Sequence, residues 1–462
     1  MLQDTNNLPT LKEVEVTLFR ELQSHFQDIL TQVLEELDVL LMENRDHKRL
    51  AYHEKQACTM DTLFGPVTIN RRKYVDRETS ERVALLDRTL EFEGSSSLSP
   101  FLTEIAVEWA VKGPSYRDAK HRLEKLLGYP VISHEQIRQQ VLQVKAKERT
   151  AGHTKPKQKD VLFLEVDGLQ ASLQQSKKSS HEIKVGIVHE GWDKRHPKSS
   201  EYELLNKSYV HTLDNGDTFW ETFSRELEQL YTMTEETYVI INGDGAPWIR
   251  AGVDYFRNAR YVYNRYHLKK WIKQALGNRT KAERKRVYQA AEAYDVSAML
   301  AAIAEAEKAE TDVEKKQEIA TLREFVLEHQ TAFQDYRVWL EDKGIDTSDM
   351  RPMGAAESNM NLLSKRLKQS GYSWSLPGLG AMVNALFHRF EGSLVDALRS
   401  PTKPSVSEEK IPAKKPSIAE ILKQKTRESM GAISGRIPVL AGHDQNKPYG
   451  QALRGLTRIS EV

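Results

Sequence analysis

The sequence is short of cysteine, of long apolar runs and of targeting signals. Cys58 is the only cysteine among 462 residues, which excludes an internal disulfide framework and a zinc site built on several thiolates. No apolar run approaches the roughly 18 residues that a membrane-spanning helix needs. The first ten residues, MLQDTNNLPT, contain neither the basic nor the apolar region of a signal peptide. We therefore expect a cytoplasmic protein with no membrane partner.

Net charge is nearly absent as well. The 67 basic and 66 acidic residues give a formal charge of +1, so the whole chain is neither a polycation nor a polyanion. Charges of one sign can still be gathered in parts of the chain. The charged share of 29% and the apolar share of 39% are ordinary for a globular protein, and the length allows more than one domain.

Residues 1–150 are predicted to form a mainly helical, DNA-binding region that contains one hairpin. Apolar residues recur every three or four positions through residues 11–52, the period of an amphipathic helix. Two β-prone runs then surround Gly65 in CTMDTLFGPVTINRRKYVD and predict a hairpin. Its second strand ends in three basic residues, Arg71, Arg72 and Lys73. These would either contact DNA phosphates or protect a solvated edge strand.

Residues 100–145 have the outline of a helix-turn-helix. A capped helix that stops near Gly128 is followed by a second helix capped at Ser133. In a DNA-binding motif this second helix would present Gln136 and Arg138 to a groove of the duplex. A helical hairpin with no role in DNA binding fits the same pattern.

The rest of the chain is predicted to contain an α/β core that is interrupted by helices. After a lysine-rich linker at 148–160, strand signals with short links are followed by helix, strand, helix and strand. This order predicts a mixed sheet with antiparallel and parallel pairs. The predicted parts are the first part of the core (158–267), an all-α insertion (268–345), the final helices of the core (346–400) and a basic, weakly ordered tail (401–462).

Two carboxylates share one face of the first core strand, in FLEVDG. Side chains two apart in a strand point the same way, so Glu165 and Asp167 emerge together, opposite Leu164 and Val166. A buried ionised carboxylate needs a cation or hydrogen-bond donors. We expect Asp167, at the strand end beside a glycine, to meet a metal ion, and Glu165 to pair with a basic side chain.

Asp167, Asp244 and Glu357 form the candidate metal site. Asp244 ends a later strand in INGDGAPW, and Glu357 opens a helix in GAAESNM. Carboxylate oxygens suit Mg²⁺ or Mn²⁺, and two such ions can activate water and stabilise the leaving oxygen of a phosphodiester. Taken singly, an Asp before Gly is also a turn former, and a Glu at a helix start also favours the helix dipole.

These residues carry a resemblance to a known family. The order of elements and the trio Asp167, Asp244 and Glu357 resemble the DDE transposases, whose catalytic domain has the RNase H-like fold. More narrowly, FLEVDG, VHEGW, FWE, INGDGAPWI and YNRYHLK are similar to bacterial insertion-sequence transposases of the ISLre type, relatives of the Mutator-like group. The resemblance runs through most of residues 57–390.

The resemblance implies an RNase H-like mixed sheet and an enzyme that cuts at transposon ends and joins them to target DNA. It implies Mg²⁺ or Mn²⁺ as the cofactor, double-stranded DNA with terminal inverted repeats as the partner, and a homo-oligomer. Relatives commonly carry Cys or Asp three residues before a histidine that supports catalysis, and here the pair is Asn264 and His267. Asn264 can orient His267 by hydrogen bonding but supplies no negative charge. A structural histidine at a strand–helix junction is the alternative.

Further DNA contacts are predicted on the helix that carries Glu357. Three basic residues follow it, Lys365, Arg366 and Lys368. Cations there would offset the repulsion between the carboxylates and phosphate, although a solvated helix face carries such residues too. Two other functions fit the sequence: an RNase H-like nuclease without strand transfer, and a catalytically decayed DNA-binding protein.

Overall fold

The protein divides into two compact units. The computed structural model describes residues 9–90, 92, 98–146, 156–174, 177–369 and 371–398. The predicted tail, 401–462, and residues 148–155 of the predicted linker lie outside the described residues. Within them, the first unit comprises residues up to 107 and 117–137, and the second comprises 108–116 and 138–398. The division passes through helices α3 (Pro100–Lys112) and α5 (His134–Leu142).

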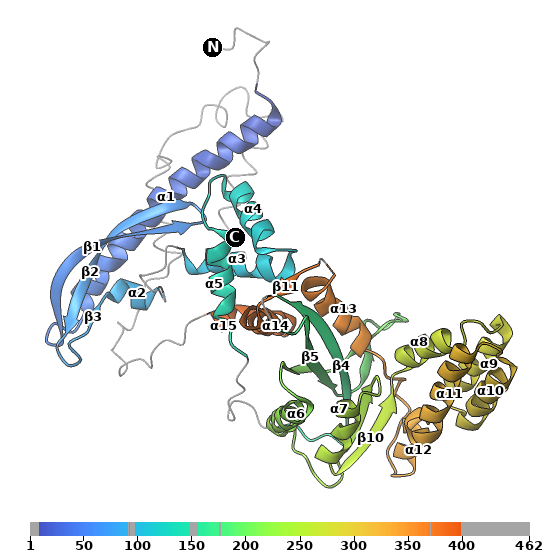
Figure 1. Ribbon diagram of the computed structural model, residues 1–462. Helices are drawn as coiled ribbons and strands as arrows, with labels where there is room; N and C mark the ends of the chain where they lie inside the picture. The colour runs from blue at the N-terminus through green and yellow to red at the C-terminus, as the bar shows by residue number, and fades with distance from the viewer. Residues whose placement is uncertain are drawn as a thin grey trace, which may run out of the picture. The chain divides into compact units, whose positions relative to one another are not determined.

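The first unit is built on a long helix and the predicted hairpin (Figure 1). Its first elements are α1 (Leu11–Asn44), β1 (Leu50–Thr62), β2 (Gly65–Asp76), β3 (Arg82–Val83) and α2 (Leu85–Thr89). Helix α1 begins at a capping box formed by Thr10 and Glu13. It ends earlier than residue 52, the predicted limit, because β1 has already begun there. Gly65 follows the hairpin turn with a φ of +120°, which favours glycine.

The apolar faces of α1 and the hairpin form the core of this unit. Alternate side chains of β2 point toward α1, so Val67 and Ile69 are buried beside Leu34. Cys58 lies in the same cluster, where burial raises the pKa of its thiol. A raised pKa keeps the thiol protonated at neutral pH, so Cys58 acts as a packing group.

Arg71 and Arg72, predicted to contact DNA, are held in ion pairs within this unit. The Arg71 guanidinium lies 2.8 Å from the carboxylate of Asp87 on α2, and Arg71 is 4% exposed. The Arg72 guanidinium lies 2.5 Å from the carboxylate of Asp38 on α1. Phosphate binding would therefore require these pairs to break. Lys73 is half-buried.

The helical pattern predicted for residues 100–145 is confirmed by α3, α4 (Tyr116–Leu127) and α5. Gly128 ends α4 with a φ of +79°. The backbone N–H of Gln136 donates to Ser133 Oγ at 3.1 Å, and the Gln136 side chain accepts the Ser133 N–H at 2.9 Å. Gln136 and Ser133 thus cap the start of α5 together. Arg138, the other residue predicted to enter a DNA groove, is half-buried.

The second unit contains the predicted mixed sheet. Its strands are β4 (Val161–Leu173), β5 (Ser180–His189), β8 (Ser208–Thr212), β9 (Tyr238–Gly243), β10 (Asn258–Tyr263) and β11 (Ser373–Trp374). They lie in the order β10-β9-β4-β5-β8, with β11 also paired to β4. Strands β4, β5 and β8 pair antiparallel, whereas β9 is parallel to β4 and β10 is parallel to β9. Short strands β6 (Trp192–Lys194) and β7 (Tyr202–Leu204) form a separate pair.

Both faces of β4 are covered, which explains its nearly continuous burial. The even-numbered apolar residues Leu162, Leu164 and Val166 pack in one cluster with residues of α6 (Gly216–Leu230). On the other face, the ring of Phe163 lies 5.9 Å from that of Tyr336 in α12 (Tyr336–Glu341). Glu165 and Asp167 share the face of Phe163 because strand side chains alternate.

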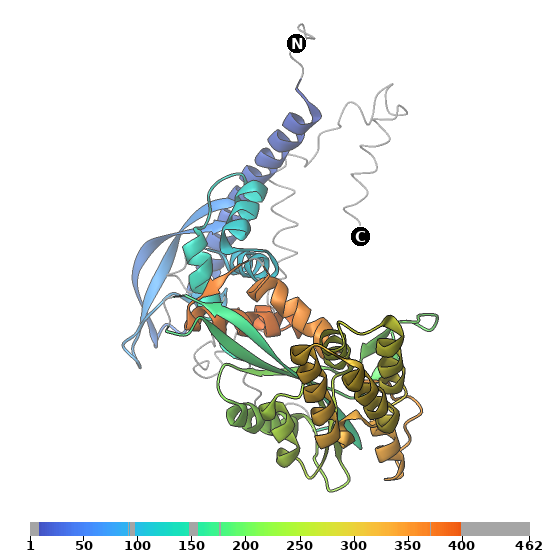
Figure 2. The same ribbon diagram turned by 45° about the vertical axis from the view of Figure 1, so that its right-hand side comes forward.

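Helices occupy most of the chain after β9. They are α7 (Pro247–Arg250), α8 (Arg265–Ala275), α9 (Lys281–Glu292), α10 (Val296–Ala309), α11 (Val313–Glu328), α12, α13 (Ala356–Leu367), α14 (Leu376–Phe390) and α15 (Leu394–Leu398). Helices α8 to α11 share an apolar core of their own, and Figure 2 shows α9, α10 and α11 packed together. No helix among the described residues is both long and apolar enough to cross a membrane.

The pair between Arg72 and Asp38 should contribute strongly to stability. Asp38→Ala leaves the Arg72 guanidinium without its counter-charge and the Arg72 backbone N–H without its acceptor. We expect the free energy of unfolding, measured by urea denaturation, to fall by about 3–5 kcal/mol. The control is Arg122→Ala, which removes a more exposed pair with Asp118 and should cost less than about 1 kcal/mol. Equal losses for the two variants would contradict the prediction.

Candidate metal centre

The pairing of β4 with β9 brings two predicted site residues to one end of the sheet. The last paired residues are Glu165 and Asn242, in parallel register. Asp167 and Asp244 each lie two residues further along their chains. Strand β9 ends at Gly243, whereas β4 continues past Asp167 to Leu173, so Asp167 does not lie at a strand end as predicted. Both aspartates lie beside the carboxyl end of β9.

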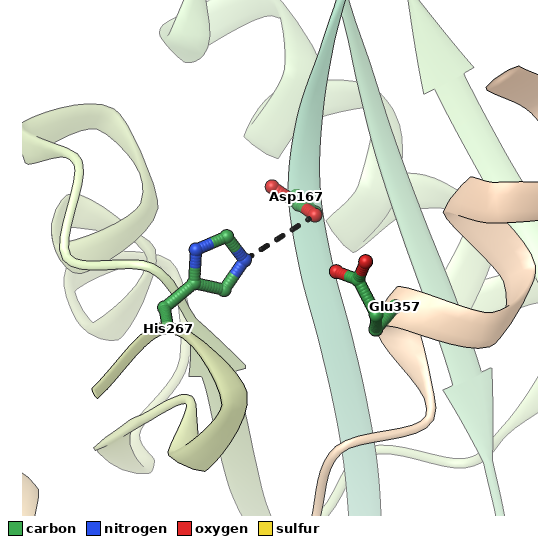
Figure 3. Close-up of side chains that lie close together, drawn as sticks. All are labelled: Asp167, His267 and Glu357. Carbon is green, nitrogen blue, oxygen red and sulfur yellow. Dashed lines mark ion pairs between the residues drawn. The ribbon is translucent and has the colours of Figure 1, made fainter. Parts of the chain in front are cut away.

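Three of the predicted residues form a cluster at this end: Asp167, His267 and Glu357 (Figure 3). One ligand atom from each lies within 4.8 Å of the others. Asp167 comes from β4, His267 from the first turn of α8 and Glu357 from the first turn of α13. Asp167 is 8% exposed and the other two are half-buried. The cluster is therefore partly shielded from water while two of its members remain open to it.

Asp244 lies beside this cluster but is not one of its three members. Its Oδ1 accepts the backbone N–H of Ala246 at 3.0 Å, in the turn that follows β9. Gly245 in this turn has a φ of +91°, which favours glycine. The Asp244 carboxylate still acts on the cluster, because it helps to raise the pKa of His267.

The pKa of His267 is raised above its ordinary value of 6.5. The main cause is the Asp167 carboxylate, whose Oδ2 lies 3.8 Å from Nε2 of His267 and stabilises the imidazolium. Asp244 and Glu357 act in the same direction, and burial opposes them. A proton on His267 thus offsets part of the negative charge of the acidic groups.

Asn264 fixes the start of the helix that carries His267. Its Oδ1 accepts the backbone N–H groups of Tyr266 at 2.9 Å and His267 at 3.4 Å, so it is the N-cap of α8. Its Nδ2 donates to Oδ1 of Asn242 on β9 at 3.0 Å, and Asn264 is 1% exposed. An ionised aspartate could not donate this bond. The asparagine therefore orients the histidine through the backbone.

The sequence predicts that Glu165 pairs with a basic side chain, and the ring of His189 does lie 4.0 Å from it, but its hydrogen bonds are made with the backbone. Its carboxylate accepts three backbone N–H groups, from Gly354 at 2.9 Å, Ala355 at 3.0 Å and Ala356 at 3.3 Å. Burial raises the pKa of Glu165, and the three hydrogen bonds oppose that rise. These donors are backbone N–H groups just before and at the start of α13. Because every residue except proline carries such a group, the sequence does not show which of them bind Glu165.

The cluster fits a divalent cation. Two carboxylates supply the oxygen ligands that suit Mg²⁺ or Mn²⁺, whereas a neutral imidazole favours softer transition metals. In this cluster such oxygen ligands come from Asp167 and Glu357, and His267 lies beside them. Asp167 and Glu357 are thus the residues that would hold the cation.

The basic residues predicted on α13 lie in two different environments. Lys365 and Lys368 are exposed, whereas Arg366 is 6% exposed and its Nε donates to the carbonyl of Ala110 at 3.2 Å. Its guanidinium also lies 5.1 to 5.6 Å from the ring centroids of Tyr116, Tyr372 and Trp374. Arg366 therefore fastens α13 to residues 108–116, and only the two lysines face solvent.

The fold and the cluster define a mixed α/β protein with a candidate divalent metal centre. The model of the family described as "Uncharacterised protein family (UPF0236)" matches residues 4–403. The chain therefore belongs to the UPF0236 family.

Named relatives in this family come from bacteria. A UPF0236 protein from Streptococcus gallolyticus, named for the vanSb 3' region, is 26% identical over 81% of each chain. A UPF0236 protein from Caldanaerobacter subterraneus subsp. tengcongensis is 23% identical over 77% of this chain and 73% of its own. Among solved structures, the Drosophila P element transposase strand transfer complex matches with 13% identity and a TM-score of 0.23, over 70% of this chain and 85% of that one. So low a TM-score establishes no shared fold.

The raised pKa of His267 should depend on Asp167. An NMR titration of the metal-free protein should place this pKa above 6.5, and Asp167→Asn should lower it. The contact between protonated His267 and Asp167 adds to the free energy of unfolding. Because the pKa of His267 is higher in the folded state than in the unfolded state, this contribution is complete below the unfolded pKa and is lost as the pH rises through the folded pKa. Glu305→Gln, an exposed carboxylate paired with Arg286, is the control and should leave the titration unchanged. A pKa that Asp167→Asn does not move would refute this account of the cluster.

Asn264→Ala should destabilise the protein by more than the loss of an ordinary cap. The variant removes the N-cap of α8 and leaves buried Oδ1 of Asn242 without this donor. We expect the free energy of unfolding to fall by about 2–3 kcal/mol in urea denaturation. Thr280→Ala removes the exposed cap of α9 and should cost about 1 kcal/mol. If the two costs are equal, the bond to Asn242 contributes nothing.

Proposed function

We propose that the protein is a DNA transposase. It would use a divalent cation to hydrolyse phosphodiester bonds at the ends of a mobile DNA element and to join those ends to target DNA. The observation that carries the proposal is the cluster of Asp167, His267 and Glu357 beside the carboxyl end of β9, with Asp244 next to it. Residues far apart in the chain meet there in a group suited to metal-dependent phosphate chemistry.

The order of the strands supports an RNase H-like catalytic domain. Strands β4, β5 and β8 form an antiparallel meander, and β9 and β10 follow as parallel strands. This is the element order on which the resemblance to the DDE transposases rests. The helices from α8 to α11 lie between the second aspartate and Glu357 in the sequence, as the predicted insertion does.

The names of the relatives offer separate support. The Caldanaerobacter relative carries eleven locus designations in its name, and two further relatives from that organism carry four and two. One protein encoded at many places in a genome is the pattern that a self-copying DNA element leaves behind. A mobile DNA element of this kind would account for the repeated genes of the UPF0236 family.

The residues of the cluster divide the proposed chemistry between metal binding and contact with phosphate. Asp167 and Glu357 would hold Mg²⁺ or Mn²⁺, with Asp244 as the remaining ligand of the predicted trio. Such a cation lowers the pKa of an attacking water and stabilises charge on the leaving oxygen. Nε2 of His267 lies 3.8 Å from the Asp167 carboxylate, which favours the protonated ring, and it would place positive charge, or a proton, near a phosphate oxygen. Asn264 holds the histidine in this position.

The exposed lysines of α13 would bind the DNA backbone. Lys365 and Lys368 follow Glu357 on the same helix and its C-cap, so phosphates bound to them would lie along the helix that enters the cluster. Each neutralised phosphate contributes affinity that falls steeply with salt. Arg366, held among three rings, would act on DNA only by keeping α13 in place. Double-stranded DNA and a homo-oligomeric assembly are part of the proposal.

The test is cleavage of DNA taken from the flanks of the reading frame. Full-length protein should cut it with Mg²⁺ or Mn²⁺ and not with EDTA. Asp167→Asn, Asp244→Asn and Glu357→Gln should each lower the rate by about 10³-fold or more, because metal-ion catalysis supplies several kcal/mol and each 1.36 kcal/mol is tenfold. Binding to the same DNA, followed by fluorescence anisotropy, should survive. Asp193→Asn, an exposed change on β6, is the control and should cut normally.

Two outcomes separate the alternatives. When a pre-cut end is supplied, a transposase should join it to a second duplex, whereas a nuclease without strand transfer should cut and never join. Binding without any cutting by the unaltered protein would indicate a catalytically decayed DNA-binding protein. Full activity in any of the three site variants would remove that residue from the centre.

A further inference from the structure

The carboxylate of Glu165 is buried against the start of the helix that carries Glu357. Glu165 is 1% exposed, and its two oxygens accept the N–H groups of Gly354, Ala355 and Ala356. These donors are consecutive, so the chain just before α13 wraps around one carboxylate. Gly354 has a φ of +151°, which L side chains rarely adopt, and thereby helps to aim the N–H groups at one point.

Glu165 supplies the cap that α13 lacks. The N-cap residue of α13 is Ala355, and no side chain from that position caps the helix. The first N–H groups of a helix have no partner within it and favour a negative charge. Glu165 provides that charge from β4, and the first turn that it holds contains Glu357.

No cation competes for Glu165 within the described part of the chain. The ring of His189 lies beside it, with Nε2 4.0 Å from Oε1 and without a hydrogen-bond partner. The pKa of His189 is lowered to about 4 by burial, so its ring is neutral at pH 7. The three backbone donors are therefore what makes burial of the carboxylate tolerable.

We propose that Glu165 is a positioning residue that sets Glu357 against Asp167 and His267. The inference rests on the proposed function, because Glu357 is there a metal ligand. Asp167 and Glu165 lie two residues apart on one strand face. The strand that offers one ligand thus also holds the helix that offers the other, and the distance between the two carboxylates is set by β4. Glu165 itself touches neither the cation nor the substrate.

The decisive measurement is Mn²⁺ affinity of the full-length protein, by titration calorimetry or electron paramagnetic resonance. Glu165→Gln keeps the shape of the side chain but removes its charge. It should raise the Mn²⁺ dissociation constant by about 10–100-fold, the usual effect of losing a group that orients a ligand. Glu357→Gln should weaken binding by at least as much. The double variant should bind no more weakly than Glu357→Gln alone, since Glu165 acts through Glu357.

Amide hydrogen exchange in metal-free protein gives an independent readout. The N–H groups of residues 354–356 should exchange faster in Glu165→Gln than in the unaltered protein, while the N–H groups of β9 keep their protection. Gly354→Ala disturbs the same backbone donors without changing Glu165. A Cβ at residue 354 meets no atom within 4 Å, so the substitution acts through strain in the backbone. It should weaken Mn²⁺ binding with Glu165 intact. This variant decides the matter if Glu165→Gln fails to fold.

Glu190→Gln is the matched control. The Glu190 side chain is 3% exposed and is bound by Lys157 and Lys159, so it is a buried carboxylate that holds no part of α13. Its loss should leave Mn²⁺ affinity unchanged, and an equal loss there would overturn the inference. Unchanged affinity in Glu165→Gln, or additive losses in the double variant, would also overturn it. Unchanged affinity in Glu357→Gln would overturn the proposed metal site together with it.

Discussion

The parallel pairing of β4 with β9 places Asp167 beside the turn that carries Asp244, and the candidate centre is built around this point. Glu165 and Asn242 are the last paired residues, so β9 ends beside Asp167 while β4 continues to Leu173. A shift of one residue would turn Asp167 toward α6 and bring an apolar side chain into the centre. The register is protected by burial on both faces, where Leu164 packs with α6 and Phe163 with α12.

Much of the centre follows from local pattern. Period-two alternation placed Glu165 and Asp167 on one face, and the glycine-flanked Asp244 marked the end of a second strand, because these features depend only on near neighbours. The partner of Glu165 could not be predicted in this way. Its donors are backbone N–H groups of a Gly-Ala-Ala segment, and every residue except proline carries such a group. Mixed α/β class and helix positions were predictable; the link between β4 and α13 was not.

The environments of Arg71 and Arg72 could not be predicted from local pattern, whereas that of Arg366 could have been. Whether Arg71 and Arg72 face solvent depends on Asp87 and Asp38, which come from other elements. Arg366 was different, because it lies three residues after Leu363 on α13, on the side that the buried leucines define. Helical periodicity alone would have separated Arg366 from its exposed neighbours.

The bond between Glu165 and Gly354 joins residues 189 positions apart, and this has a consequence for the newborn chain. Translation adds about 5–20 residues per second, so roughly 10–40 s separate the synthesis of β4 from that of its cap donors. Throughout that interval the ribosome-bound chain has a carboxylate in its central strand with no partner and lacks Glu357 altogether. Contacts this distant in sequence also form late in folding. An incomplete polypeptide would thus lack the candidate centre, which can be assembled only once translation has passed the whole helical segment.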